Sequence, residues 1–229
     1  MDNVNQYDCL LQLVKNRRTI RQFSSKPVPD EYITKIIEVA RWAPSAFHTQ
    51  PWEFVIIKNQ DIKNKIVAAL EQHGPPIKDP NKESLPRKSF KDAPVFILLL
   101  CDWRASIGLP GRTSENKAQV ANLYYSSLAN AFLYMHLAAS ALGLSSQWYT
   151  ATSRSEAERA IKEIVGIPEA LTIYDMMVVG YAANPPDPKI IRDIDEITHY
   201  DNCGEQDFRA DEEVTDYAKI TKAWCISQH

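Results

Sequence analysis

The sequence predicts an α+β fold in which helices and short buried strands form one globular domain. Three observations lead to this class. Apolar residues recur with the helical period in several segments, short apolar runs between them have the length of strands, and 45% of the 229 residues are hydrophobic. A chain of this length and composition can bury a substantial core, and it is neither disordered nor fibrous.

The first two helices are predicted from apolar stripes. The first helix carries a stripe that we expect to be buried, made of Tyr7, Leu10, Leu11 and Val14. The same spacing recurs over residues 30–43. Pro44 should end this second helix, because the residue before a proline is disfavoured in the α region. We therefore expect a rigid loop over residues 45–50.

The next part of the chain predicts two strands, a helix and a long loop. Residues 54–57 and 95–101 have the composition of buried strands, and the second is too apolar to face water on either side. A helix is expected over residues 61–72. Residues 74–90 are rich in proline and lysine, so we expect a surface loop that serves as a flap beside a substrate.

The longest predicted helix spans residues 115–142, and Gly143 is well placed to end it. Much of its second half is apolar, so a membrane-spanning helix is the alternative. Asn130, His136 and Ser140 interrupt the apolar run, and its flanks lack the charges typical of a span. We therefore predict a helix in the protein core, with His136 as a structural residue.

The last predicted elements are a helix and a strand. Residues 155–158 have the pattern of a capping box, which would begin a helix that ends before Gly166. Residues 172–181 form a third predicted strand. A proline-rich stretch over residues 184–188 then begins a C-terminal extension.

Three arginines within five residues give the strongest functional signal. Arg17, Arg18 and Arg21 concentrate positive charge at the end of the first helix, in a chain whose formal net charge is −3. Arginine suits bidentate contacts to phosphate, so a phosphorylated ligand would compensate the repulsion among these side chains. The alternative is a solvated basic cluster that the helix macrodipole favours.

Further segments make the phosphate hypothesis more specific. The arginine stretch RRTIRQF at residues 17–23 is followed by APSAFHTQPW at residues 43–52. This pair resembles the nitroreductase family, whose flavin mononucleotide (FMN) enzymes carry RRSxRxF and APSSxNxQPW. The strings ALGLS at 141–145, GIP at 166–168 and DEITHYD at 195–201 extend the resemblance in family order, over roughly residues 7–203.

The resemblance implies a fold and an assembly. It implies a mixed, mainly antiparallel sheet flanked by helices in a single domain over residues 1–229, with a core over 7–203 and an extension over 185–229. The long helix would lie at the centre of a homodimer, and the segment after Pro188 would wrap around the partner.

The resemblance also implies an FMN site shared between the two subunits. One group would hold the phosphate and the pyrimidine edge of the ring: Arg17, Arg18, Thr19 and Arg21. A loop would reach the flavin of the other subunit through Pro44, Ser45, Ala46, His48 and Gln50. A third segment would pack along the ring and offer backbone N–H groups, through Trp148, Tyr149, Thr150 and Ala151. Further phosphate ligands would be Lys189 and Arg192.

Several of these positions depart from the family pattern. Ala46 replaces a serine and so removes a hydroxyl donor, and His48 replaces an asparagine but can still donate and accept hydrogen bonds. Thr150 and Ala151 replace glycines, which changes the backbone freedom of that segment.

The implied activity is hydride transfer from NAD(P)H through FMN to a nitroaromatic, a quinone or a similar small conjugated acceptor, in a ping-pong cycle. The flavin does the redox chemistry, so no catalytic side chain is expected. The seven glycines never form GxGxxG, which fits transient binding of NAD(P)H rather than a Rossmann domain. The choice between NADH and NADPH stays open.

Two alternatives also stay open. One is another flavin reaction on the same scaffold, such as dehalogenation, ene reduction, dehydrogenation or flavin fragmentation. The other is a flavin-binding protein without turnover.

Composition argues against several other classes. The mixed charges form no extended basic face for nucleic acid or membranes. The four cysteines form no Cys-x-x-Cys pair, which argues against zinc and iron–sulfur sites, and no signal peptide pattern begins the sequence. We expect a cytoplasmic enzyme without a metal.

Overall fold

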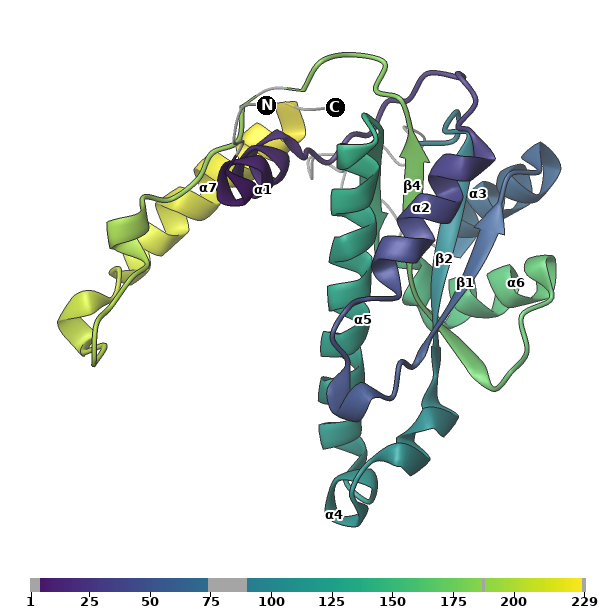
Figure 1. Ribbon diagram of the computed structural model, residues 1–229. Coiled ribbons are helices and arrows are strands. Elements are labelled where there is room, and N and C mark those ends of the chain that lie inside the picture. The colour runs from purple at the N-terminus through teal and green to yellow at the C-terminus, as the bar shows by residue number, and fades with distance from the viewer. Residues whose placement is uncertain (1–4, 74–89, 187, 228–229) are drawn as a thin grey trace. The chain divides into compact units, whose positions relative to one another are not determined.

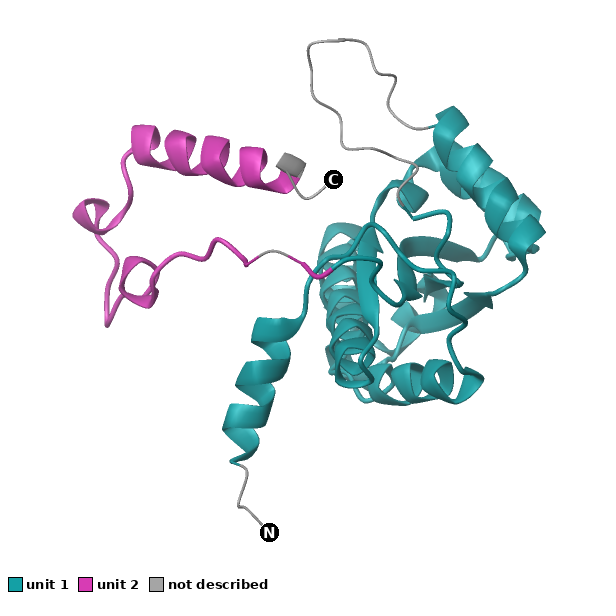
Figure 2. Cartoon of the chain, turned by 90° about the horizontal axis from the view of Figure 1, so that it is seen from above, with its two compact units in different colours: residues 1–76, 87–184 teal, residues 77–86, 185–229 magenta. Residues whose placement is uncertain are grey.

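A computed structural model describes residues 5–73, 90–186 and 188–227. The chain divides into two compact units (Figure 2). The first comprises residues 1–76 and 87–184, and the second comprises residues 77–86 and 185–229. The assignment of the whole chain to a single domain stays a prediction.

A four-stranded antiparallel sheet forms the centre of the first unit (Figure 1). Its strands lie in the order β1 (Trp52–Ile57), β2 (Val95–Asp102), β4 (Leu171–Gly180) and β3 (Ser145–Tyr149). The predicted α+β class is confirmed. All pairs of these strands are antiparallel, and a parallel bridge joins Thr19 to Ser146 beside β3.

Helices cover both faces of this sheet. In the first unit the helices are α1 (Gln6–Asn16), α2 (Asp30–Ala40), α3 (Gln60–His73), α4 (Gly111–Ser114), α5 (Lys117–Ala141) and α6 (Ser155–Val165). Three short 3-10 turns are η1 (Ala46–His48), η2 (Trp103–Gly108) and η3 (Ala151–Ser153). Helices α2 and α5 pack on one face, and α3 and α6 pack on the other (Figure 1).

Strand β2 lies at the centre of the sheet, and its continuous apolar run explains why the sequence predicted a strand buried on both faces. Val95, Ile97 and Leu99 face α2 and α5, whereas the residues between them face α3 and α6. Because successive side chains of a strand point to opposite faces, a strand covered on both faces is apolar throughout. Residues 95–101 are all buried, as predicted.

Two predictions of burial are wrong. Helix α1 forms where predicted, but none of its residues is buried, and Tyr7 and Leu10 are 64% and 53% exposed. Strand β1 lies at the edge of the sheet, so Phe54 and Val55 are only partly buried and Ile56 is exposed. Edge strands lack a neighbour on one side, and the apolar run alone does not reveal this.

Most predicted helices form, with some changes at their ends. Helix α2 ends at Ala40, three residues before the predicted end. Helix α5 runs close to its predicted limits, and Gly143 follows it with a φ of 72°. The long apolar helix packs in the core, and no helix among the described residues is both long and apolar enough to cross a membrane.

The predicted capping box of α6 is wrong. The helix begins at Ser155, and Arg154 precedes it without a side-chain cap. Glu158 instead accepts a hydrogen bond from the backbone N–H of Ile173 at 2.9 Å, so it binds the helix to β4. The predicted flap over residues 74–90 lies, apart from Phe90, outside the described residues.

The described residues of the second unit form two 3-10 turns and one helix. These are η4 (Ile194–Glu196), η5 (Glu205–Asp207) and α7 (Asp211–Ser227). Helix α7 was not predicted, because its apolar residues show only weak helical periodicity and carry no strong start signal.

Substituting Gly166 by alanine is expected to destabilise the protein by about 1 kcal/mol, because a Cβ is disfavoured in the left-handed region. Gly166 ends α6 with a φ of 78°. Gly111 is a matched control, since it does not have a positive φ and a Cβ there would meet no atom within 4 Å. Urea unfolding of the two variants should separate them, and equal midpoints would contradict the expectation.

Candidate functional site

The arginine segment leaves α1 in an extended conformation and lies along strand β3. Arg17 is the C-cap of α1 and has extended backbone angles. Two residues further on, Thr19 bridges to Ser146, and the N–H of Ile20 donates to the Ser146 carbonyl at 3.0 Å. Ser146 lies in β3, so the predicted phosphate ligands lie beside the strand that carries the predicted ring segment.

The electrostatics of this segment suit an anion. Arg17 and Arg18 are both half-buried. Burial, together with the charge of Arg18, lowers the pKa of Arg17, and no carboxylate among the described residues forms an ion pair with Arg17. Arg18 also donates to the carbonyls of Lys15 and Arg17, which closes the end of α1. A bound phosphate would relieve the repulsion between these cations.

The side chains of the ring segment pack into the core. The Trp148 indole donates to Asp175 Oδ2 at 2.6 Å and stacks on the His136 ring at 5.7 Å. Tyr149 points to the opposite face, where its ring centre lies 4.5 Å from that of Phe90. Contact of these two rings with a flavin stays a prediction. Thr150 and Ala151 follow the end of β3, so they lie outside its ladder of hydrogen bonds.

His136 lies beneath the arginine segment. Its Nδ1 lies 2.6 Å from the Ser146 hydroxyl, and the side chain is 3% exposed. Burial, together with the charge of Arg17, lowers its pKa to about 3, so the ring is neutral at ordinary pH. The Nδ1 contact and the burial agree with the predicted structural role, but the buried Nε2 has no hydrogen-bond partner among the described residues.

The loop over residues 45–50 is strained and bound to α5. Phe47, His48 and Gln50 have φ values of 49°, 56° and 46°, in the left-handed region. Such a conformation costs roughly 1–3 kcal/mol for each non-glycine residue and is found mostly at functional sites. The Ser127 hydroxyl accepts from the Ala46 N–H at 3.0 Å and holds the loop on the helix.

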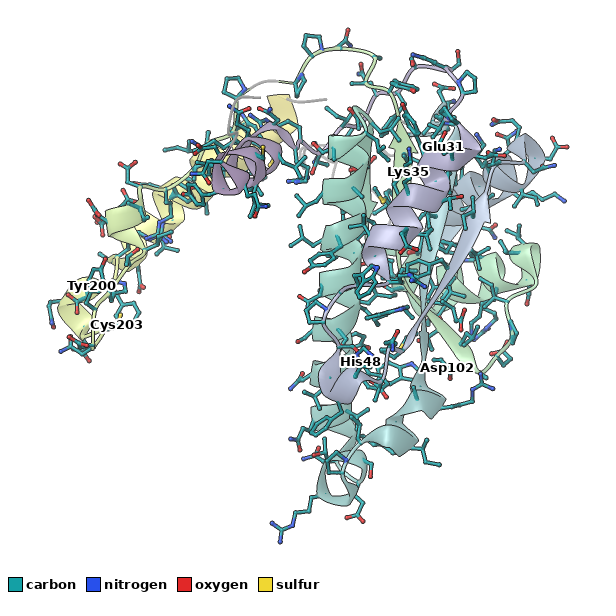
Figure 3. The ribbon with its side chains drawn as sticks, in the orientation of Figure 1. Glu31, Lys35, His48, Asp102, Tyr200 and Cys203 are labelled. Atoms are coloured by element: carbon teal, nitrogen blue, oxygen red, sulfur yellow. The ribbon has the colours of Figure 1, made fainter. Side chains whose placement is uncertain are left out.

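The predicted loop residues contact one another. The Ser45 hydroxyl accepts from the Gln50 N–H at 3.1 Å, and the Gln50 amide nitrogen lies 3.1 Å from His48 Nε2. If this amide donates, His48 carries its proton on Nδ1. Figure 3 shows His48 on η1, beside the N-terminal half of α5. Phe47 at the tip of the loop is 62% exposed.

Within one chain, the loop over residues 45–50 and the arginine segment lie at different points along α5. Ser127 anchors the loop and His136 bonds to the strand beside the arginines. These two residues are nine positions apart on α5, which corresponds to about 13 Å along the helix axis. Lys189 and Arg192 belong to the second unit, where Arg192 forms an ion pair with Glu196 at 3.2 Å.

Asp175 is a buried acidic residue that none of the sequence motifs indicated. This residue lies in the middle of β4 and is 6% exposed. Burial raises its pKa to about 6, against the opposing effect of the Trp148 hydrogen bond. A carboxylate within an otherwise apolar strand was the available signal, because buried charges without partners are rare.

The fold and site define a nitroreductase-like enzyme, and sequence comparison agrees. The pattern of the Nitroreductase family matches residues 14–181, so the chain belongs to the nitroreductase family.

Individual relatives fit this assignment. The chain is 27% identical to a protein of Methanothermobacter thermautotrophicus provisionally named NADH dehydrogenase/NAD(P)H nitroreductase. The aligned region of 188 residues covers 82% of this chain and 85% of that protein. A 61-residue segment, 27% of this chain and 21% of the relative, is 48% identical to iodotyrosine deiodinase 1 of Rattus norvegicus. The NADPH:FMN oxidoreductase of Vibrio harveyi, solved in complex with NAD+, has a TM-score of 0.72 at 18% identity and covers 93% of this chain and 85% of that chain. This last likeness concerns the fold.

Proposed function

We propose that the protein is an FMN-dependent oxidoreductase that takes hydride from NAD(P)H and passes it through the flavin to a nitroaromatic, a quinone or a similar small conjugated acceptor. The bridge between Thr19 and Ser146 carries this proposal, because it sets a cationic segment beside β3. From Ser146 to Thr150 the chain extends about 13 Å. A ligand with a phosphate at one end and a flat ring at the other fits this arrangement.

The protein's part is to bind and orient the cofactor, and bound FMN would supply the hydride chemistry. Arg17, Arg18 and Arg21 would hold the phosphate and the pyrimidine edge of the ring, with the Thr19 hydroxyl beside them. The backbone of Thr150 and Ala151 would donate to the ring edge. Lys189 and Arg192 remain proposed phosphate ligands.

The site would be completed by a second copy of the chain. Its loop, with Ser45, His48 and Gln50, would reach the flavin that the first copy binds. Exposed apolar side chains support a homodimer, since monomeric proteins rarely expose many together. In the first unit they include Tyr7, Leu10, Trp42, Phe47, Ile107 and Leu133, and in the second they include Ile191, Ile194, Tyr200 and Phe208. We also propose a cytoplasmic location, where the four free cysteines would stay reduced.

We expect the purified protein to be yellow and to contain about one non-covalent FMN per chain, because the arginines suit a single terminal phosphate. Heat release and chromatography identify the flavin, and anaerobic NAD(P)H followed by an acceptor tests repeated turnover. Finding FAD, or no flavin after reconstitution with FMN, would reject the cofactor. Flavin that NAD(P)H cannot reduce would favour a binding protein without turnover.

Light scattering is expected to show a dimer whose stability increases with bound FMN, because a ligand that binds only the assembled state stabilises it. A charged substitution at Leu10 should weaken the dimer and FMN retention together. Glu71 to glutamine, at an exposed position on α3, serves as a control. A monomer that binds FMN with unchanged affinity would contradict the shared site.

Reductive dehalogenation is a second candidate, favoured by the 61-residue match to iodotyrosine deiodinase 1. The match covers about a quarter of this chain, so it carries less weight than the family assignment. Incubating the reduced protein separately with a nitroaromatic, a quinone and a halogenated phenol, and identifying the products, distinguishes these reactions.

A further inference from the structure

A cavity of about 350 Å³ lies where β2 and β3 end and β4 begins. Its walls include three aromatic side chains, two carboxylates and several hydroxyl groups, among them Trp103, Tyr125, Tyr174, Asp175, Glu158 and Thr150. Of the two carboxylates, Glu158 accepts from the Ile173 N–H and lies 3.9 Å from Lys162 Nζ. None of these aromatic or acidic residues belongs to the flavin site proposed above. The cavity therefore needs its own explanation.

A β-bulge in β4 directs two of these side chains. Across the sheet Leu99 pairs with Asp175 and Leu100 pairs with Ile173, so Tyr174 is an extra residue without a partner. The side chains of Ile173 and Met176 face α3 and α6, whereas Tyr174 packs on the α5 side. Asp175 bonds to Trp148 on that side as well. Bulges redirect side chains in this way and are frequent next to functional sites.

The carboxylate of Asp175 has no cationic partner among the described residues. Its hydrogen bond comes from the neutral indole of Trp148 at 2.6 Å, and no ion pair with a lysine, arginine or histidine is present in the described part of the chain. An uncompensated buried charge is unfavourable. A positively charged ligand would compensate it.

Three aromatic rings line the same cavity. The centres of the Trp103 and Tyr125 rings lie 5.7 Å apart at 89°, and those of Tyr125 and Tyr174 lie 6.1 Å apart. The Trp103 indole donates to the Thr172 hydroxyl at 2.7 Å, which fixes its orientation. Aromatic faces attract organic cations, whereas calcium or magnesium would need several oxygen ligands.

We propose that this cavity binds an organic cation, a protonated alkylamine that carries an aromatic ring, with the ammonium group at Asp175 and the ring against Trp103, Tyr125 and Tyr174. Thr150 lines the cavity and also belongs to the predicted flavin segment. An occupant would therefore lie beside the flavin. That consequence depends on the proposed function, whereas binding of the amine does not.

The full-length protein, with and without FMN, is titrated with benzylamine, with the neutral benzyl alcohol and with the anionic benzoate, by calorimetry and tryptophan fluorescence. Benzylamine is expected to bind at least about tenfold more tightly than benzyl alcohol, with benzoate weakest. Asp175→Asn keeps an acceptor for Trp148 but removes the charge, so it should abolish this preference. Glu53→Gln, at an exposed carboxylate on β1, should leave it unchanged.

Tyr125→Leu provides a second variant that does not depend on the folding of Asp175→Asn. Tyr125 is 51% exposed, so its loss should leave the fold intact while weakening benzylamine binding several-fold. Equal binding of benzylamine and benzyl alcohol, no benzylamine binding at millimolar concentration, or unchanged preference in folded Asp175→Asn would overturn the proposal. Amine binding by a protein that fails to bind FMN would reject the proposed function and leave this site standing.

Discussion

Replacing Arg17 by alanine is expected to lower the affinity for FMN by about tenfold to a hundredfold, because a hydrogen bond between charged groups contributes about 1.5–3 kcal/mol. Arg17 is half-buried at the end of α1, and burial and the charge of Arg18 lower its pKa. The charged form is therefore disfavoured in the flavin-free fold. Removing this cation should not destabilise the flavin-free protein, although it weakens cofactor binding.

Quenching of FMN fluorescence by the flavin-free protein measures this affinity, and urea unfolding measures stability. Arg112→Ala is the matched control, since Arg112 is an exposed arginine on α4. Arg18→Ala is less informative, because Arg18 also bonds to carbonyls at the end of α1. If folded Arg17→Ala binds FMN as tightly as the parent, the arginine segment is a surface feature and the residue assignment fails.

Elements buried on both sides were predictable from the sequence. Strand β2 and helix α5 lie in the core, so their apolar patterns are long and continuous, and their predicted limits are close to those observed. The arginine segment was also recognisable, because clustered charge at the end of a helix has few explanations.

The elements at the borders of the unit were harder to predict. Strand β3 contains Ser145, Ser146 and Gln147, and this polar composition hides an edge strand. The stripe of α1 is apolar but exposed in the single chain, because sequence periodicity identifies an apolar face without identifying what covers it.

The environment of Asp175 depends on long-range pairing. The bulge opposite Leu99 and Leu100 arises from the register of β2 and β4, which lie about 75 residues apart in the sequence. The hydrogen bond from Trp148 comes from a third strand. No local pattern contains this information, so the sequence showed the position of a carboxylate without showing its surroundings.

Replacing Asp175 by asparagine is expected to raise the free energy of unfolding near neutral pH by up to about 3 kcal/mol. Burial raises the pKa of Asp175 to about 6 from the ordinary value of 3.8. Between these values the folded protein holds a proton that the unfolded chain releases. Its contribution to stability therefore falls as pH rises through this window and stays low above it. Asparagine remains neutral and still accepts the Trp148 hydrogen bond.

Urea unfolding of the parent and Asp175→Asn between about pH 4 and pH 8 measures this difference. The two proteins should be nearly equal at the acidic end and diverge until about pH 6. Other titrations, including that of His136, occur in both proteins and cancel in the difference. Asp102→Asn should behave oppositely, because the hydrogen bond from Arg104 lowers the pKa of Asp102, so its stabilisation is present near neutral pH and lost as pH falls.

A parent more stable than Asp175→Asn near neutral pH would show that this carboxylate stabilises the fold, and the main reason to expect a cationic ligand would disappear. If Asp175→Asn is instead the more stable protein near neutral pH, as expected, the buried carboxylate destabilises the fold. If asparagine fits the same space and makes the protein more stable, the aspartate does not serve the stability of the fold. A role in ligand binding explains its presence, since activity and stability commonly conflict at functional sites. Benzylamine should then stabilise the parent against urea much more than Asp175→Asn, because a ligand stabilises the folded state more the more tightly it binds that state.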